Sequence, residues 1–162
     1  MAGFIFSIGF IIIVIAIIVV VSKSQQRYTK KILSKLEYYS FEKIQIRFLQ
    51  SSVGKGSVVG GLPVKAVLYF SNDLILIAPK ENGNFNGLFN FNLPVIIVKN
   101  KEKVHELEFG NVVVPDKINL STWNSISIKY QKTLIGNIKY SIQINLLDKN
   151  DIEKIKEIKN WC

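Results

Sequence analysis

Side chains that commonly carry catalysis or bind metals are scarce in this sequence. It contains one histidine, His105, and one cysteine, Cys162, and it has no HExxH, CxxC or GxSxG motif. His105 alternates with Leu107 and Phe109, which favours a histidine at the edge of a core over a general base or a metal ligand. Cys162 follows Trp161 and is expected to be an unpaired thiol. We therefore predict no catalytic residue, no metal site and no cofactor.

A glycine-rich stretch at residues 54–61, GKGSVVGG, invites a nucleotide-binding interpretation. A Walker loop needs a glycine, then a gap of four residues, and then Gly-Lys followed directly by Ser or Thr. A dinucleotide fingerprint needs a helix directly after the glycines. Neither condition holds. The glycines are followed not by a helix but by an expected extended segment, which begins at Leu62, Pro63 and Val64. We predict a flexible loop between strands, and the alternative is a backbone nest that binds an anion together with Lys55.

Residues 81–92, ENGNFNGLFNFN, place three phenylalanines and one leucine in a segment rich in Asn and Gly. Loops of that composition are usually solvated, so these apolar side chains either fold back onto the core or contact a partner. Phe91 adjoins an expected strand and is predicted to be buried. Phe85, Leu88 and Phe89 are the candidate partner-binding residues.

Five cations that follow a long apolar segment form a basic neck. They are Lys23, Arg27, Lys30, Lys31 and Lys35. The same stretch carries apolar side chains at helical spacing, which predicts one narrow apolar stripe on a helix. The stripe consists of Tyr28, Ile32, Leu36 and Tyr39. Either the neck continues the preceding helix and docks on the domain, or its cations contact anionic headgroups at the membrane surface, at roughly 1 kcal/mol per residue.

The segment before the basic neck has the length and composition to cross a membrane. Residues 3–21 are apolar except for Ser7 and would form roughly 28 Å of helix, which matches the core of a bilayer. A signal peptide is the alternative, but the segment lacks an N-terminal Lys or Arg and an A-x-A cleavage site. All flanking positive charge follows the segment. The positive-inside rule therefore predicts a single-pass membrane protein with its N-terminus outside and its C-terminal domain in the cytoplasm.

Alternation of apolar and polar residues dominates the chain after residue 42 and predicts strands. The expected strands are residues 43–48, 64–70, 74–78, 93–99, 104–109, 125–132 and 138–147. Asn72 and Asp73 predict a tight turn between the second and third strands, and Pro79 ends the third. In the last two strands the apolar residues occupy even positions, so the loop between them must contain an odd number of residues. We expect residues 134–136, with Gly136 left-handed.

The C-terminal residues predict a short amphipathic helix. Asn150 followed by Glu153 is typical of an N-cap with its capping-box partner. One apolar face of this helix would consist of Ile152, Ile155, Ile158 and Trp161. Since no helix is expected between strands, a parallel βαβ fold is excluded in favour of an antiparallel seven-stranded sandwich or partial barrel. We expect a transmembrane anchor at residues 1–22, a basic juxtamembrane linker at 23–40 and a mainly-β domain at 41–162.

This order of elements resembles the pleckstrin-homology (PH) superfold, including its GRAM-like and bacterial members. Residues 65–79, KAVLYFSNDLILIAP, look like the strand-turn-strand segment common in those domains. In many of them a tryptophan of the final helix packs on the sheet, and Trp161 lies in the corresponding helix, although nearer its end. The resemblance covers residues 43–161 and implies seven antiparallel strands closed at one end by the C-terminal helix.

The net charge of +9, from 21 Lys and Arg against 12 Asp and Glu, raises the question of nucleic-acid binding. The basic neck supplies five of the positive charges, and Lys/Glu alternation at 99–108 and 149–159 is typical of solvated faces, so no nucleic acid is predicted. The leading hypothesis is a non-enzymatic, membrane-tethered binding or scaffolding module that recruits a protein partner or engages the membrane surface. The alternatives are a structural or accessory subunit of a membrane complex, and an enzyme subunit whose site a partner completes.

Overall fold

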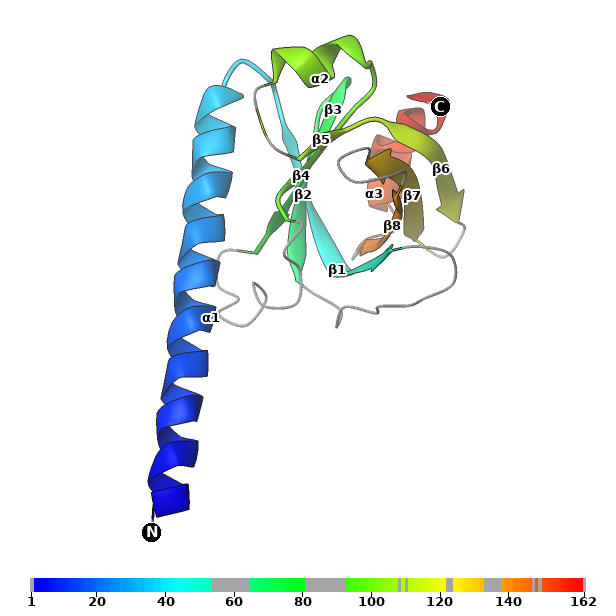
Figure 1. The fold of residues 1–162 in the computed structure, drawn as a ribbon. Coiled ribbons are helices and arrows are strands. Elements are labelled where there is room, and N and C mark those ends of the chain that lie inside the picture. Colours follow the sequence, from blue (N-terminus) through cyan, green and yellow to red (C-terminus); the bar gives the residue numbers. More distant parts are fainter. Residues whose placement is uncertain are drawn as a thin grey trace.

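The computed structural model describes residues 2–53, 65–80, 93–107, 109, 111–121, 124–132, 138–146, 148 and 150–161. The helices are α1 (Ala2–Lys35), α2 (Glu102–Glu106), α3 (Asn150–Lys154) and the 3₁₀ helix η1 (Lys156–Trp161). The strands are β1 (Glu42–Val53), β2 (Ala66–Phe70), β3 (Leu74–Pro79), β4 (Val95–Val98), β5 (Val112–Val113), β6 (Pro115–Ser121), β7 (Ser125–Lys132) and β8 (Ile138–Leu146). Figure 1 shows the long helix α1 lying along one side of the bent sheet.

α1 is one continuous helix that runs from the apolar segment to the end of the basic neck. Lys, Arg, Gln and Leu in the neck are good helix formers, so the helix passes residue 22 without a break. It ends at Lys35, where the N–H of Leu36 donates to the carbonyl oxygens of Ile32 and Leu33 at 3.0 and 3.1 Å. The linker expected at residues 23–40 is thus helical over most of its length.

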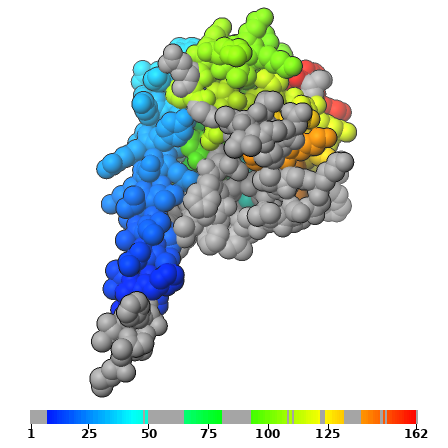
Figure 2. Space-filling view, in the orientation of Figure 1, coloured from blue at the N-terminus to red at the C-terminus, as the bar shows by residue number. Residues whose placement is uncertain are grey.

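The N-terminal part of α1 exposes its apolar side chains. Phe10 is 69% exposed and Val20 is 66% exposed. Figures 1 and 2 show this part of the helix, in blue, extending beyond the β domain. Within the described residues, α1 is long and apolar enough to cross a membrane. A contiguous apolar surface of this kind is typical of a segment that contacts lipid or another protein.

The eight described strands form one open sheet in the order β5-β4-β3-β2-β1-β8-β7-β6. β1 is 12 residues long, and it pairs with β2 through residues 42–45 and with β8 through residues 46–53. Its register on β8 shifts between Ile46 and Phe48, and such an irregularity bends a strand. β1 therefore joins two halves of the sheet, with β2–β5 on one side and β6–β8 on the other.

The main core lies between the two halves of the sheet. Alternate residues of β1, β2 and β3 face the apolar residues of β7 and β8, as expected for strands with one buried face. Its aliphatic members include Ile44, Leu68, Ile75, Ile77, Ile126, Ile128, Ile142 and Ile144. Burial in this core raises the pKa of the Tyr130 hydroxyl to about 12, and the Tyr130 ring stacks on that of Tyr140 at 5.3 Å.

A second apolar cluster joins α1 to the outer face of the sheet. β3 is buried on both faces: Ile75 and Ile77 point into the main core, whereas Leu74 and Leu76 point to the outer face. That outer face is covered by Ile32 of α1 and by Leu36 in the turn directly after α1, which are 1% and 0% exposed. Tyr28 and Tyr39 pack against the same cluster. The four stripe residues therefore join α1 and the turn after it to the sheet, and we call them the docking seam. Only Tyr28 and Ile32 lie on the helix, whereas Leu36 and Tyr39, which were predicted on the same helix, follow its end at Lys35.

Two predicted hairpins, β2–β3 and β7–β8, form with the expected partners. β2 pairs with β3 so that Phe70 faces Ile75, and the Ser71 N–H donates to the Leu74 carbonyl oxygen across the turn at 2.9 Å. β7 pairs with β8 so that Lys132 faces Ile138, which leaves the odd number of residues that the shared face requires. The loop conformation predicted at residues 134–136 lies outside the described residues.

The strand predicted at residues 104–109 is wrong. The chain forms the helix α2 there, and His105 is exposed on it rather than placed at a core edge. Leu107 and Phe109 nevertheless pack in the outer cluster, because a short apolar pattern fits one helical turn as well as a strand. A hydrogen bond from Lys103 to Asp73 at 3.0 Å holds α2 against the β2–β3 turn and raises the pKa of Lys103.

Two strands were missed, and the count of seven is replaced by eight in the described part of the chain. β5 pairs with β4 in parallel, so the sheet is not wholly antiparallel. β6 is an edge strand that starts at Pro115, and its burial does not alternate strictly. A proline is tolerated at the start of an edge strand, where it also obscures the strand pattern in the sequence.

The C-terminal helices α3 and η1 close the main core on one side, as their spacing predicts. Ile155, Ile158 and Trp161 are buried there, and intervals of three residues suit a 3₁₀ helix. The predicted capping box is wrong, because the N–H of Asn150 donates to the Asp148 carboxylate at 2.9 Å. Glu153 instead pairs with Lys156 at 3.2 Å.

Candidate functional site

The outer face of the sheet is only partly covered by α1. The docking seam lies over β3 and β4, whereas the outward residues of β1 and β2 flank it. Lys43 faces Tyr69 and Gln45 faces Val67 in the β1–β2 register, so all four side chains belong to this outer face. The edge of α1 and these two strands enclose a pocket beside the docking seam.

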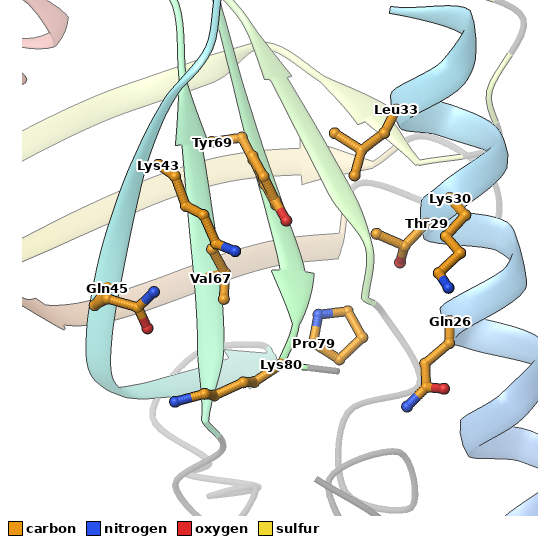
Figure 3. Close-up of a pocket in the computed structure, with 10 residues that line it drawn as sticks. All are labelled: Gln26, Thr29, Lys30, Leu33, Lys43, Gln45, Val67, Tyr69, Pro79 and Lys80. Atoms are coloured by element: carbon orange, nitrogen blue, oxygen red, sulfur yellow. The ribbon is translucent and has the colours of Figure 1, made fainter. Parts of the chain in front are cut away.

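This pocket, which we call the neck pocket, has a volume of about 190 Å³. α1 contributes one wall, and β1, β2 and the end of β3 contribute the other (Figure 3). The lining residues are Gln26, Thr29, Lys30, Leu33, Lys43, Gln45, Val67, Tyr69, Pro79 and Lys80. Figure 3 shows Gln26 and Lys80 at the end of the pocket nearest the N-terminal part of α1. The pocket therefore lies beside the basic neck, next to the segment predicted to enter the membrane.

The neck pocket is positively charged. Lys30 of α1, Lys43 of β1 and Lys80 after β3 line it, and no described Asp or Glu does. The Lys43 Nζ lies 5.9 Å from the centroid of the Tyr69 ring, a distance typical of a cation–π contact. Gln26 and Gln45 add amide groups to the lining, and Thr29 adds a hydroxyl that donates to the Gln25 carbonyl oxygen at 2.9 Å. Such a site suits a small anion with several acceptor oxygens.

The remaining neck cations lie on a different side of α1. Lys23, Arg27, Lys31 and Lys35 recur every four residues, which places them along one ridge of the helix. All four are exposed, and the docking seam lies on a separate ridge. Lys35 also places its Nζ 5.5 Å from the centroid of the Phe109 ring. Of the five predicted membrane-contacting cations, Lys30 alone lines the neck pocket.

Several candidate residues lie outside the described part of the chain. They are Phe85, Leu88, Phe89 and Phe91 of the aromatic segment, the glycine-rich residues 54–61, and Cys162. Their assignments stay predictions. Among the described residues, no group of three or more His, Cys, Asp or Glu side chains could hold a metal ion.

Sequence reasoning missed the contribution of the sheet to the neck pocket. Alternation along β1 indicated that Lys43 and Gln45 share the face opposite to Ile44. Nothing in that pattern showed that α1 would pack beside this face and convert it into a pocket wall. Nothing in the sequence indicated that Lys80 would line the neck pocket, because a lysine after a strand-ending proline is an ordinary solvated residue.

The chain was compared with protein families, with curated proteins and with solved structures. No match was found in any of the three comparisons.

Proposed function

We propose that this protein is a single-pass, membrane-anchored binding module that holds its β domain at the cytoplasmic membrane surface. One observation carries the proposal: α1 is at once the apolar helix that could cross a membrane and part of the packed domain. Because Ile32 and Leu36 are buried under the sheet, the domain cannot swing freely about a flexible tether. Its height above the bilayer would then be fixed by the helix itself.

The cytoplasmic orientation rests on charge. The ridge of exposed cations begins directly after the apolar segment, where a cytoplasmic leaflet carries anionic lipids. Each exposed Lys or Arg close to such a surface contributes roughly 1 kcal/mol of attraction. In this proposal Lys23, Arg27, Lys31 and Lys35 contact headgroups while the docking seam holds the domain.

A PH-like architecture is part of the proposal. It is supported by the long strand β1, which joins two halves of an antiparallel-rich sheet, and by the C-terminal helices that bury Trp161 against the core. By analogy with small sandwich domains, which usually bind through loops or a sheet edge, we expect recognition at such positions. The proposed role is non-enzymatic: the module engages the membrane surface or recruits a protein partner, with Phe85, Leu88 and Phe89 as the predicted partner-binding residues.

Orientation can be tested by cysteine labelling in intact cells. In a Cys162→Ser background, Lys129→Cys places a thiol at an exposed position of β7. We expect no labelling by a membrane-impermeant maleimide until the cells are permeabilised, because the domain is proposed to be cytoplasmic. A matched variant, Ala2→Cys, should be labelled in intact cells. Labelling of the Lys129→Cys thiol in intact cells would place the domain outside and overturn the proposed function.

A further inference from the structure

Tyr38, in the turn after α1, presents an aromatic ring to solvent. Among the described residues beyond Val20 it is the only large apolar side chain that is exposed, at 72%. Its ring centroid lies 4.4 Å from that of Tyr39, and the Tyr39 centroid lies 5.9 Å from that of Phe41. Tyr38 is thus the outermost member of a run of packed rings. Tyrosine is among the residue types that most often dominate the energetics of protein interfaces.

The same rings line a groove of about 600 Å³ between the turn after α1 and the β2–β3 turn. We call it the tyrosine groove. Its lining includes Tyr38, Tyr39, Phe41, Glu42, Phe70 and Asp73. Its described lining carries two carboxylates and no Lys or Arg, which is the reverse of the neck pocket. In a chain with a net charge of +9, this groove is a place where a cationic partner meets negative charge.

Glu106 of α2 brings a further carboxylate close to Tyr38. Partial desolvation raises the pKa of the Tyr38 hydroxyl, and so do its hydrogen bond with Tyr39 and the negative charge of Glu106. Glu106 is exposed and forms no ion pair with a Lys or Arg of the described ranges. Asp73 and Glu42 each pair with a lysine through one oxygen, at 3.0 and 2.9 Å, and both side chains remain 47% exposed.

Lys103 shows how this surface holds a cation. Its Nζ lies 3.0 Å from the Asp73 carboxylate and 5.6 Å from the centroid of the Tyr39 ring, so one ammonium group contacts a carboxylate and an aromatic face together. Tyr38 and Glu106 present the same pair of groups to solvent. An arginine suits them better than a lysine, because a guanidinium stacks on a ring and donates two parallel hydrogen bonds to a carboxylate.

We infer that the tyrosine groove binds an arginine side chain of a protein partner, with the guanidinium on the Tyr38 ring and paired with Glu106. The height of the groove favours a protein over a lipid, an argument that rests on the proposed membrane anchoring. Lys35, at the end of α1, lies thirteen residues beyond Ser22, which is about 20 Å along a helix axis. The headgroup layer of one leaflet is only about 5–8 Å thick. Figure 1 shows α2 and the end of α1 together, at the end of the domain farthest from the N-terminus of α1.

Binding of a fluorescein-labelled tetra-arginine peptide to the full chain in phosphatidylcholine nanodiscs tests the inference. Fluorescence anisotropy follows the titration, and tetra-citrulline, which has nearly the same shape without the charge, is the control peptide. We expect saturable binding of tetra-arginine and no binding of tetra-citrulline. Tetralysine is expected to bind several-fold more weakly, because an ammonium group cannot stack or pair in two places.

Four variants locate the bound peptide. Tyr38→Leu removes the exposed ring and Glu106→Gln removes the charge beside it, and each is expected to weaken binding about fivefold. Tyr38→Phe keeps the ring, and Glu102→Gln is the same change on the same helix, so both should bind as the parent does. Tyr38, Glu102 and Glu106 are all exposed, so the variants are expected to fold.

Absence of saturable tetra-arginine binding, undiminished binding by Tyr38→Leu, or equal losses with Glu102→Gln and Glu106→Gln would overturn the inference. Equal binding of tetralysine would overturn the assignment to arginine. The proposed membrane anchoring would stand after any of these results, because cysteine labelling reads the orientation separately.

Discussion

Deletion of residues 1–40 is expected to yield a β domain that aggregates, whereas deletion of residues 1–22 is expected to yield a folded monomer. The longer deletion removes the docking seam and uncovers the outer face of β3 and β4. That face consists of Leu74, Leu76, Ala78, Ile96 and Val98, all at most 1% exposed in the intact chain. A contiguous apolar patch of this kind promotes association in water. Size-exclusion chromatography with light scattering and circular dichroism would compare the two fragments.

The two fragments differ only in residues 23–40, so the comparison isolates the docked part of α1. Both keep the main core and the C-terminal helices. If residues 41–162 alone are monomeric and melt at the same temperature as residues 23–162, then α1 contributes nothing to the fold. In that case the helix would be a tether, and the fixed height proposed for the domain would have no basis.

Leu36→Ala is expected to destabilise the fragment of residues 23–162 by about 2–5 kcal/mol. Leu36 is fully buried between α1 and the sheet, so the truncation removes apolar contacts and leaves a cavity. A loss of this size is a large part of the 5–15 kcal/mol by which domains are usually stable. Urea denaturation followed by circular dichroism would measure it.

Leu33→Ala provides the control for Leu36→Ala. It is the same substitution three residues earlier in the chain, but Leu33 is only partly buried and lies at the edge of the docking seam. We expect a clearly smaller loss of stability. Equal effects of the two substitutions, or a negligible effect of Leu36→Ala, would contradict the packing described for α1.

Local patterns in the sequence were sufficient to predict the elements whose residues share a buried face. Spacing by three and four residues predicted which side chains form the docking seam, although the helix ends between Ile32 and Leu36. Parity of the apolar positions predicted an odd number of residues between β7 and β8, as their pairing shows, since residues directly opposed in a sheet share a face. Each inference used only geometry within one element or one hairpin.

The errors arose where a segment was too short for its periodicity to be distinctive. Leu107 is buried and Phe109 is partly buried, and both could be so placed by a turn of helix or by a strand, so the pattern at α2 did not decide between them. β6 begins at Pro115 and lies at the edge of the sheet, where exposed polar residues hide the alternation. β5, with two residues, is defined only by its pairing with β4.

The neck pocket could not have been predicted, because it depends on contacts between distant segments. The sequence showed the cations of the basic neck and the alternation of β1, but not that Lys30 and Lys43 would lie on either side of one cavity. That arrangement follows from the docking of α1 on β3 and β4, which places the edge of the helix beside the open part of the sheet.

Hydrogen exchange of the full chain in nanodiscs tests most directly whether α1 is both the membrane anchor and part of the domain. Amides of residues 26–35 and those of β3 are followed together by mass spectrometry, because docking places both in one cooperative unit. We predict that the two segments are protected alike, and that Leu36→Ala lowers the protection of both. Complete exchange of residues 26–35 at the shortest time, with β3 still protected, would show a flexible linker and contradict the account.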